Sequence, residues 1–168
     1  MDDDIDTLSE EIDKLILQNL DLMEEKICKN LEMEQLLKGG HIELAKTKYI
    51  RGKENISMLQ VPNNEDTVTS LFDLETLEVL DDNYADRFDI NLKKLNGKAD
   101  EPKDPIKWFG LLVPQNLKTS QQCFQRSIYL AVSIANIQAN LVSLTSKLEK
   151  LYTQKDNLRH PKQQNNTT

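Results

Sequence analysis

Residues 134–151 have the sequence IANIQANLVSLTSKLEKL, in which apolar side chains recur at alternating steps of three and four residues. This heptad spacing is typical of a helix that buries one stripe against another helix. The stripe comprises Ile134, Ile137, Leu141, Leu144, Leu148 and Leu151. Upstream, Phe124 continues the pattern toward Pro114, and proline is favoured in a first helical turn. The spacing therefore predicts one long helix that begins near residue 114 and ends near residue 157.

The N-terminal forty residues contain a second apolar repeat of helical period. One stripe, the predicted coiled-coil core of this helix, comprises Leu8, Ile12, Leu15 and Leu22, and a second stripe beside it comprises Ile16, Leu20, Met23 and Ile27. These stripes predict a helix over residues 4–38. The pair Gly39-Gly40 predicts its end, because glycine readily adopts the left-handed angles of a helix C-terminus. A shorter helix is expected at about residues 41–52, which gives either a helical hairpin or a bent continuation of the first helix.

Together these patterns predict an all-α fold in which two long helices pack as a coiled-coil hairpin, with parallel or antiparallel direction left open. The expected segments are an N-terminal helical hairpin arm (1–60), an acidic flexible linker (61–103), a Trp-Phe-Gly loop with the C-terminal coiled-coil helix (104–157) and a disordered tail (158–168). The linker contains an amphipathic island at residues 67–80. Two interpretations of that island stay open, a loose helix on the coil and a segment that folds on binding.

The net charge of −7 is unevenly distributed along the 168 residues. Residues 1–60 contain 14 acidic and 8 basic side chains, residues 61–104 contain 12 and 5, and residues 105–168 contain 2 and 8. Opposite charge on the two helical arms favours their pairing. The acidic total argues against nucleic acid as a partner.

Each helical arm has a wider apolar surface than a two-stranded seam requires. On the C-terminal helix the seam is flanked by Ile128, Val132, Ala135, Ala139 and Val142. Apolar surface that one partner helix cannot cover marks an interaction site. The sequence therefore predicts a further partner chain.

Residues 127–146 contain no charged side chain, which raises the question of a membrane span. A polar stripe runs through this segment, formed by Ser133, Asn136, Asn140 and Ser143. Because lipid cannot satisfy such a stripe, the pattern favours a helix buried among other helices. The start Met1-Asp2-Asp3-Asp4 does not resemble a signal peptide, so we expect a cytosolic chain with Cys28 and Cys123 reduced.

No set of residues predicts an enzyme, a metal site or a cofactor site. His41 and His160 are far apart in sequence, and neither cysteine has an evident base beside it. The chain contains no CxxC, HExxH, P-loop or GxGxxG motif.

The loop before the long C-terminal helix contains the only Trp. Trp108 and Phe109 are interpreted either as a local core or as anchors for a partner, and Gly110 predicts a sharp bend after them. A second unusual segment places Lys46, Lys48, Arg51 and Lys53 around Tyr49. It fits anionic lipid headgroups or an acidic partner helix, with an ordinary solvated helix face as the alternative.

Two segments resemble the soluble coiled-coil assembly factors of the vacuolar proton-pumping ATPase (V-ATPase). Residues 40–49, GHIELAKTKY, are similar to the family's glycine, leucine and tyrosine pattern after the first helix. Residues 104–124, DPIKWFGLLVPQNLKTSQQCF, are similar to its more specific signature. That signature has Asp-Pro, an aromatic-Phe-Gly turn, a Val-Pro step, and Leu and Gln ahead of Phe.

The resemblance implies a non-enzymatic assembly chaperone without a cofactor. It would act on membrane-sector subunits of the V-ATPase, together with a membrane-embedded companion protein, and so support organelle acidification. Its expected location is the cytosolic face of the endoplasmic reticulum, with the intermediate compartment and Golgi as further compartments, where it is peripheral through its partner. A generic coiled-coil tether of a trafficking complex is the alternative. The partner-binding residues that the two motifs imply are Leu44, Lys46, Tyr49, Trp108, Phe109, Gly110, Leu111, Leu112, Val113, Pro114, Leu117 and Phe124.

Overall fold

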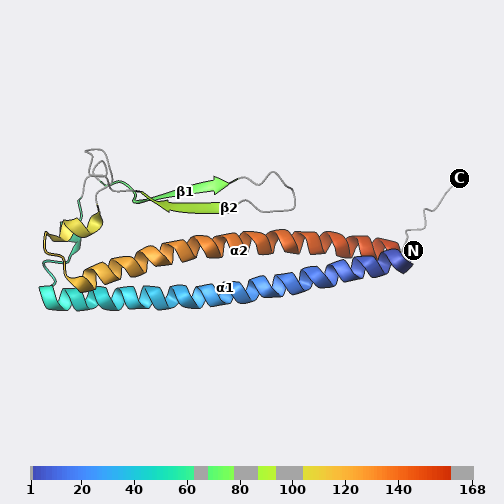
Figure 1. The fold of residues 1–168 in the computed structure, drawn as a ribbon, viewed down its shortest axis with the longest axis horizontal. Coiled ribbons are helices and arrows are strands. Elements are labelled where there is room, and N and C mark those ends of the chain that lie inside the picture. Colours follow the sequence, from blue (N-terminus) through green and yellow to red (C-terminus); the bar gives the residue numbers. More distant parts are fainter. Residues whose placement is uncertain (1, 63–67, 78–86, 94–103, 160–168) are drawn as a thin grey trace.

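In a computed structural model of the chain, residues 2–62, 68–77, 87–93 and 104–159 are described. The elements are α1 (Asp2–Arg51), η1 (Met58–Gln60), β1 (Phe72–Leu77), β2 (Arg87–Leu92), η3 (Pro105–Phe109) and α2 (Gln115–Arg159). Helices α1 and α2 lie side by side along almost their whole length, and the two strands lie along the side of α2 that faces away from α1 (Figure 1). The prediction of two long helices is confirmed.

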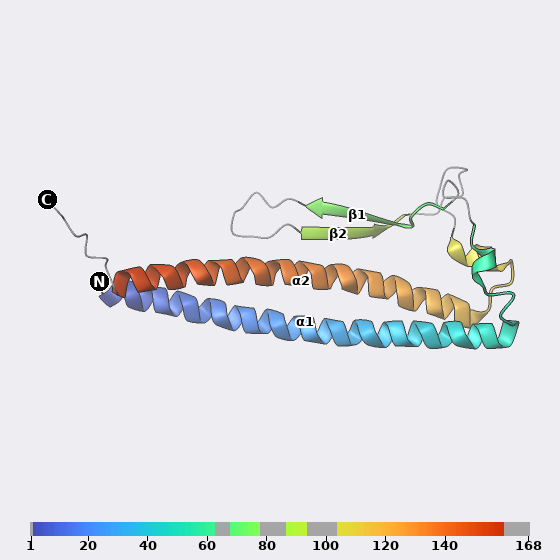
Figure 2. The same cartoon turned by 180° about the vertical axis from the view of Figure 1, so that it is seen from behind.

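The two helices are antiparallel. Near the start of α2, Asn116 Nδ2 donates a hydrogen bond to Glu43 Oε2 (2.8 Å), close to the end of α1. Farther along α2, Lys26 Nζ donates to Gln138 Oε1. Residue numbers thus rise along one helix as they fall along its neighbour, and the view from behind shows the same arrangement (Figure 2). The direction that the sequence left open is therefore settled in favour of antiparallel packing.

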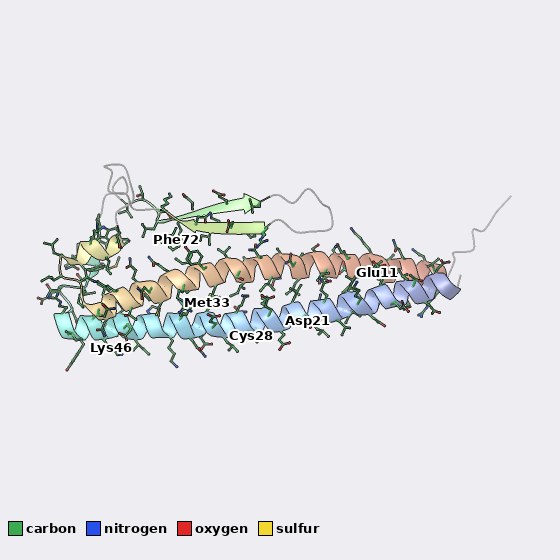
Figure 3. The ribbon with its side chains drawn as sticks, in the orientation of Figure 1. Glu11, Asp21, Cys28, Met33, Lys46 and Phe72 are labelled. Atoms are coloured by element: carbon green, nitrogen blue, oxygen red, sulfur yellow. The ribbon has the colours of Figure 1, made fainter. Side chains whose placement is uncertain are left out.

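The heptad stripes face each other across this helix pair. Ile12, Ile137, Leu141 and Leu144 are buried. The remaining predicted seam residues are half-buried, and they are Leu8, Leu15, Leu22, Ile134, Leu148 and Leu151. Met33 of α1 also lies between the helices (Figure 3). The knobs-into-holes packing of a coiled coil stays a prediction.

The predicted helix end at Gly39-Gly40 is wrong, and so is the separate short helix at residues 41–52. Helix α1 is continuous over 50 residues, about 75 Å at 1.5 Å per residue. It ends instead at Gly52, whose φ of +87° is the left-handed conformation that glycine adopts most easily. Asn55 reinforces this end, because its Nδ2 donates a hydrogen bond to the carbonyl of Arg51 (2.7 Å).

Gly40 serves the contact between the helices rather than a turn. A Cβ atom on Gly40 would lie 3.1 Å from the ring of Phe124 and 3.2 Å from the Cβ of Cys123. The buried hydroxyl of Ser120 donates a hydrogen bond to the carbonyl of Gly40 (2.8 Å). A glycine inside a helix costs about 1 kcal/mol relative to alanine. The close approach of the Phe124 ring and the bond from Ser120 offset that cost.

The all-α prediction is wrong because residues 72–77 and 87–92 form a two-stranded antiparallel sheet. Phe72 pairs with Leu92, Leu74 with Ile90 and Thr76 with Phe88, on one face of the sheet. The other face is mostly charged or polar, and it contains Asp73, Glu75 and Asp89. This alternation is the period-two pattern of a half-buried sheet.

The sheet is fixed to α2 by polar and aromatic contacts. Asn136 accepts a hydrogen bond from the backbone N–H of Phe88 (2.8 Å) and donates one to its carbonyl (2.9 Å). The side chain therefore pairs with the edge of β2 as another strand would. On the other strand, Phe72 meets Tyr129 edge to face, with ring centroids 5.7 Å apart.

The sheet also corrects the interpretation of residues 61–103 as a flexible linker. The island at residues 67–80 contains β1 and is neither a loose helix nor an unfolded segment over residues 72–77. The remaining predictions for residues 63–67, 78–86 and 94–103 lie outside the described residues. At the other end of the molecule, α2 extends to Arg159, and the predicted tail beyond it also lies outside the described residues.

Replacing each neighbouring glycine of α1 with leucine gives a matched test of the contact at Gly40. Gly39→Leu is expected to leave stability unchanged or to raise it by up to about 1 kcal/mol, because no atom lies within 4 Å of its added Cβ. Gly40→Leu is expected to lower stability by about 1–3 kcal/mol, because it displaces Phe124. Thermal unfolding followed by circular dichroism measures both. Equal effects of the two substitutions would contradict the close approach.

Asn136→Leu is expected to release the sheet from α2, because leucine cannot pair with the backbone of Phe88. Amide hydrogen exchange should become faster at Phe88 and its neighbours, while exchange in α1 stays unchanged. Asn140→Leu, one turn farther along α2 at an exposed position, is the matched control. Unchanged exchange at Phe88 in Asn136→Leu would show that this contact does not hold the sheet.

Candidate partner-binding surfaces

The two segments with family resemblance meet at one end of the helix pair, in a region that we call the elbow. The elbow comprises residues 40–60, η3 with the loop to Pro114, and the start of α2 as far as Phe124. Asp104 joins η3 to α2, because its carboxylate accepts hydrogen bonds from the Ile106 N–H (3.1 Å) and from Gln121 Nε2 (2.7 Å). One carboxylate therefore caps η3 and binds a side chain of α2.

The chain then turns sharply at Gly110 and enters α2. Gly110 has a φ of +106°, which agrees with the predicted bend. Beyond it, the guanidinium of Arg51 donates a hydrogen bond to the carbonyl of Leu112. The carbonyl of Pro114 accepts the N–H of Leu117 (3.1 Å), which begins the helical hydrogen bonding of α2. The loop is therefore fastened to the end of α1 and to the start of α2.

Part of the predicted site faces inward, around an apolar cavity of about 260 Å³ that we call the elbow pocket. Leu117 is buried, and Leu44, Phe109 and Phe124 are half-buried. The pocket is lined by these four residues together with Leu71, Phe72, Pro105, Ile106, Ser120, Gln121, Gln125 and Ile128. The edge of β1 thus closes a pocket formed by η3 and both helices.

Polar and aromatic contacts fix the α1 residues of the elbow in place. His41 meets Phe124 edge to face, with ring centroids 5.1 Å apart. Thr47 is completely buried, and its hydroxyl donates to the carbonyl of Glu43 (2.8 Å). Glu43 also accepts a hydrogen bond from Lys46 Nζ (2.5 Å). Lys46 therefore projects from the exposed side of α1 but is tied to its own helix.

Trp108 occupies a second cleft of the elbow, on the side of η1. The cleft has a volume of about 530 Å³, and its lining includes Arg51, Ile56, Trp108 and Leu112. Ile56 is buried, whereas Trp108 is half-buried. Both aromatic residues of the loop therefore take part in local packing, and Trp108 also keeps surface available for a partner.

The other predicted site residues lie on the outside of the elbow. Leu111 is fully exposed, Leu112 is 82% exposed and Tyr49 is 92% exposed. Val113 and Pro114 are half-buried. The structure thus divides the predicted site into an inner packing group and an outer exposed group.

A second candidate surface lies along the rod, away from the elbow. On α1, five apolar residues are each 49–63% exposed, and we call them the open stripe: Leu17, Leu20, Met23, Ile27 and Leu31. Beside them runs a groove of about 740 Å³ between the two helices, lined by Met23, Lys26, Ile27, Asn30, Gln138, Leu141, Val142, Thr145, Ser146 and Glu149. The sequence indicated excess apolar surface and placed the stripe of Leu8, Ile12, Leu15 and Leu22 in the coiled-coil core, but it did not identify the open stripe as a separate binding surface.

Helix α2 is the one helix among the described residues that is long and apolar enough to cross a membrane by length and composition. Only 17% of its most apolar window is buried in the structure. The low burial follows from its setting, since α1 and a small sheet cover only part of its circumference. Among the described residues, no three His, Cys, Asp or Glu side chains are grouped so that they could hold a metal ion.

Comparison with known proteins agrees with this geometry. A family model described as Vma22/CCDC115 matches residues 86–127, which include β2, η3 and the start of α2. Proteins named vacuolar ATPase assembly protein VMA22 are similar over most of the chain. The human protein is 28% identical over 170 residues, covering 86% of this chain and 94% of its own. The mouse protein is 28% identical over 156 residues, covering 82% and 87%.

The zebrafish VMA22 protein is 27% identical over 175 residues, covering 80% of this chain and 84% of its own. These relatives extend the similarity beyond the elbow to both helices. They confirm the resemblance to vacuolar ATPase assembly factors that the sequence motifs indicated. Over residues 86–127 the chain therefore matches the Vma22/CCDC115 family, and most of its length is similar to vertebrate VMA22 proteins.

Proposed function

We propose that this protein is a non-enzymatic assembly factor for the vacuolar proton-translocating ATPase. The observation that carries the proposal is the similarity to VMA22 assembly proteins over at least four-fifths of the chain. The exposed apolar surface of the rod supports it, because a protein that assembles others needs surface that only its partners cover.

The proposal has a finer form, which rests on the family resemblance of the two motifs. The protein acts on the membrane sector of the ATPase with a membrane-embedded companion, at the cytosolic face of the endoplasmic reticulum. It is peripheral to the membrane there, and its work supports the acidification of organelles. Peripheral attachment fits the packing of α2 against α1 and the sheet, since α2 is the one described helix that is both long and apolar enough to cross a membrane.

The open stripe and the groove beside it are the proposed binding surface for a partner helix. A helix laid into this groove would bury Leu20, Met23 and Ile27 against its own apolar face. The α2 wall of the groove contains Gln138, Val142, Thr145 and Ser146, which are uncharged, and the charged residue Glu149 lies at one end of it.

The charges beside the open stripe indicate what kind of helix fits. Asp13 and Asp21 lie one turn on either side of Leu17, and Glu24 lies one turn from Leu20. All three carboxylates are exposed. A partner helix with lysine or arginine along the flank that faces α1 would complement them. The proposed partner surface is thus an amphipathic helix with one basic flank.

Ile27→Asp is expected to weaken co-purification with the assembly partners at least about tenfold, because it removes a buried apolar contact and places a charge in the interface. Gln18→Asp is the matched control, since it adds the same charge on another exposed face of α1. Affinity purification from cells followed by quantification of bound V-ATPase assembly proteins measures the effect. Equal recovery with both variants would remove the groove from the mechanism. A stable homodimer of the isolated chain would favour the tether instead.

Replacing both Trp108 and Phe109 with alanine is expected to reduce co-purification and to impair organelle acidification. The double substitution empties one wall of the elbow pocket and removes the partly exposed indole. Helical content, measured by circular dichroism, should be retained, because α1 and α2 remain paired along the rod. Full recovery of partners together with normal acidification would contradict a role for this loop.

A further inference from the structure

The outer surface of the elbow exposes apolar side chains that the proposed partner helix does not contact. Three pairs of adjacent residues form what we call the tip: Tyr49-Ile50, Met58-Leu59 and Leu111-Leu112. Exposure is 92% and 65% for the first pair, 79% and 91% for the second, and 102% and 82% for the third. Six large side chains of mainly apolar character are therefore exposed. The segments that contain them lie at one end of an elongated molecule (Figure 1).

Each element of the tip is held in place by hydrogen bonds. The Leu111-Leu112 loop follows the bend at Gly110 and is fastened to α1 by the bond from Arg51 to the Leu112 carbonyl. The 3₁₀ turn of Met58-Leu59 is capped by Ser57, whose hydroxyl accepts the Leu59 N–H (3.3 Å). The loop and this turn lie on either side of the cleft that contains Trp108. The leucines are thus presented by a fixed scaffold.

The charge around the tip is opposite to that of the whole chain. Lys48, Arg51, Lys53 and Lys107 are all exposed here, whereas the net charge of the protein is −7. At the far end of the rod, the start of α1 contains the acidic run Asp2-Asp3-Asp4 and Asp6. The same end also contains Lys150, Lys155 and Arg159 of α2, so its charge is mixed. An anionic surface therefore attracts the tip more strongly than the opposite end, which would favour end-on contact.

The shape of the tip distinguishes a bilayer from a protein as its target. Protein hot spots are anchors that fit into pockets, and their side chains are packed on several sides. Leu111 has no neighbour that covers it, and Leu59 and Tyr49 are more than nine-tenths exposed. Convex leucines with a tyrosine and lysines beside them are the composition of a shallow membrane anchor.

From these observations we propose that the tip binds anionic lipid bilayers directly, with Leu111 and Leu112 inserted at the boundary of headgroups and acyl chains. Lys48, Arg51, Lys53 and Lys107 contact the anionic headgroups, and Tyr49 lies at headgroup level. This contact goes beyond the proposed attachment through a companion protein. It would place the helix pair upright on the membrane, with the open stripe available to a partner helix.

Co-sedimentation of the full-length protein with vesicles tests the proposal without any protein partner. Binding is expected to phosphatidylcholine vesicles that contain phosphatidylserine, and much less to phosphatidylcholine alone. The double variant Leu111→Asp/Leu112→Asp should bind at least about tenfold more weakly. Its control is Leu74→Asp/Leu77→Asp, which makes the same change at exposed positions of β1 and should stay within about twofold of the unchanged protein.

A charge variant tests whether the basic residues of the tip contact the anionic headgroups. Lys48→Gln/Lys53→Gln should weaken binding by about thirtyfold at low salt, since each basic residue near an anionic surface contributes about fivefold. Lys150→Gln/Lys155→Gln removes the same charge toward the far end of the rod and should have little effect. Equal losses in the two charge variants would overturn the proposed orientation.

The only tryptophan of the chain provides an independent measurement. Trp108 lines the cleft at the tip, so its fluorescence should be quenched when the vesicles contain brominated lipids. Absence of quenching, or absence of vesicle binding, would overturn the proposal. So would tip variants that bind vesicles normally but fail to recover protein partners, which would show that the tip docks a protein. None of these results depends on the ATPase role, which the co-purification of Ile27→Asp tests separately.

Discussion

Two antiparallel helices contact each other along one apolar stripe on each helix. An apolar side chain outside these stripes is exposed to water unless another element or a partner protein packs against it. In this protein the stripe of Ile12 and that of Leu141 meet in the seam. The sheet then covers part of α2, through Asn136 and the contact of Phe72 with Tyr129. No described element covers the open stripe of α1 or the groove beside it. The architecture therefore leaves the molecule with surface for a partner, whatever that partner is.

The elbow shows how such a narrow fold obtains a rigid end. Gly40 permits the ring of Phe124 to approach α1, and Ser120 secures that approach with a buried hydrogen bond. Asp104 fixes η3 on α2, and Arg51 holds the following loop. The bonds from Ser120 to Gly40 and from Arg51 to Leu112 join segments that are 80 and 61 residues apart in sequence, whereas Asp104 and Gln121 are 17 residues apart. The Vma22/CCDC115 family model matches residues 86–127, which include η3 and the start of α2. The α1 residues of the elbow lie outside that match.

The heptad spacing was sufficient to predict the long helices, because a helix that buries one stripe has apolar residues at steps of three and four in its sequence. The stripes of Leu15 and Met23 on α1 have the same period and similar side chains, and the prediction placed the stripe of Leu15 in the coiled-coil core. Gly39-Gly40 misled the prediction because glycine has two uses, a left-handed helix end and a close helix contact. Only the position of Phe124 distinguishes them.

The sheet was missed for a related reason. Leu71, Leu74 and Leu77 fit a helical repeat, while Phe72, Leu74 and Thr76 fit a strand equally well. The second strand, Arg87–Leu92, alternates in the same way and was the available signal. For the candidate site, the sequence identified the unusual loop but not its division into packing residues and exposed leucines. That division depends on the bend at Gly110 and on the bond from Arg51, which join distant segments.

Oxidative footprinting of the methionines tests most directly the claim that the open stripe is uncovered until a partner binds. Met23 lies on the open stripe and is 49% exposed, whereas Met33 lies half-buried between the helices. In the isolated protein, hydroxyl radicals should oxidise Met23 much faster than Met33, and in the complex with its assembly partners Met23 should become protected. A free monomer in which Met23 is already protected, or a complex in which its oxidation is unchanged, would contradict the account.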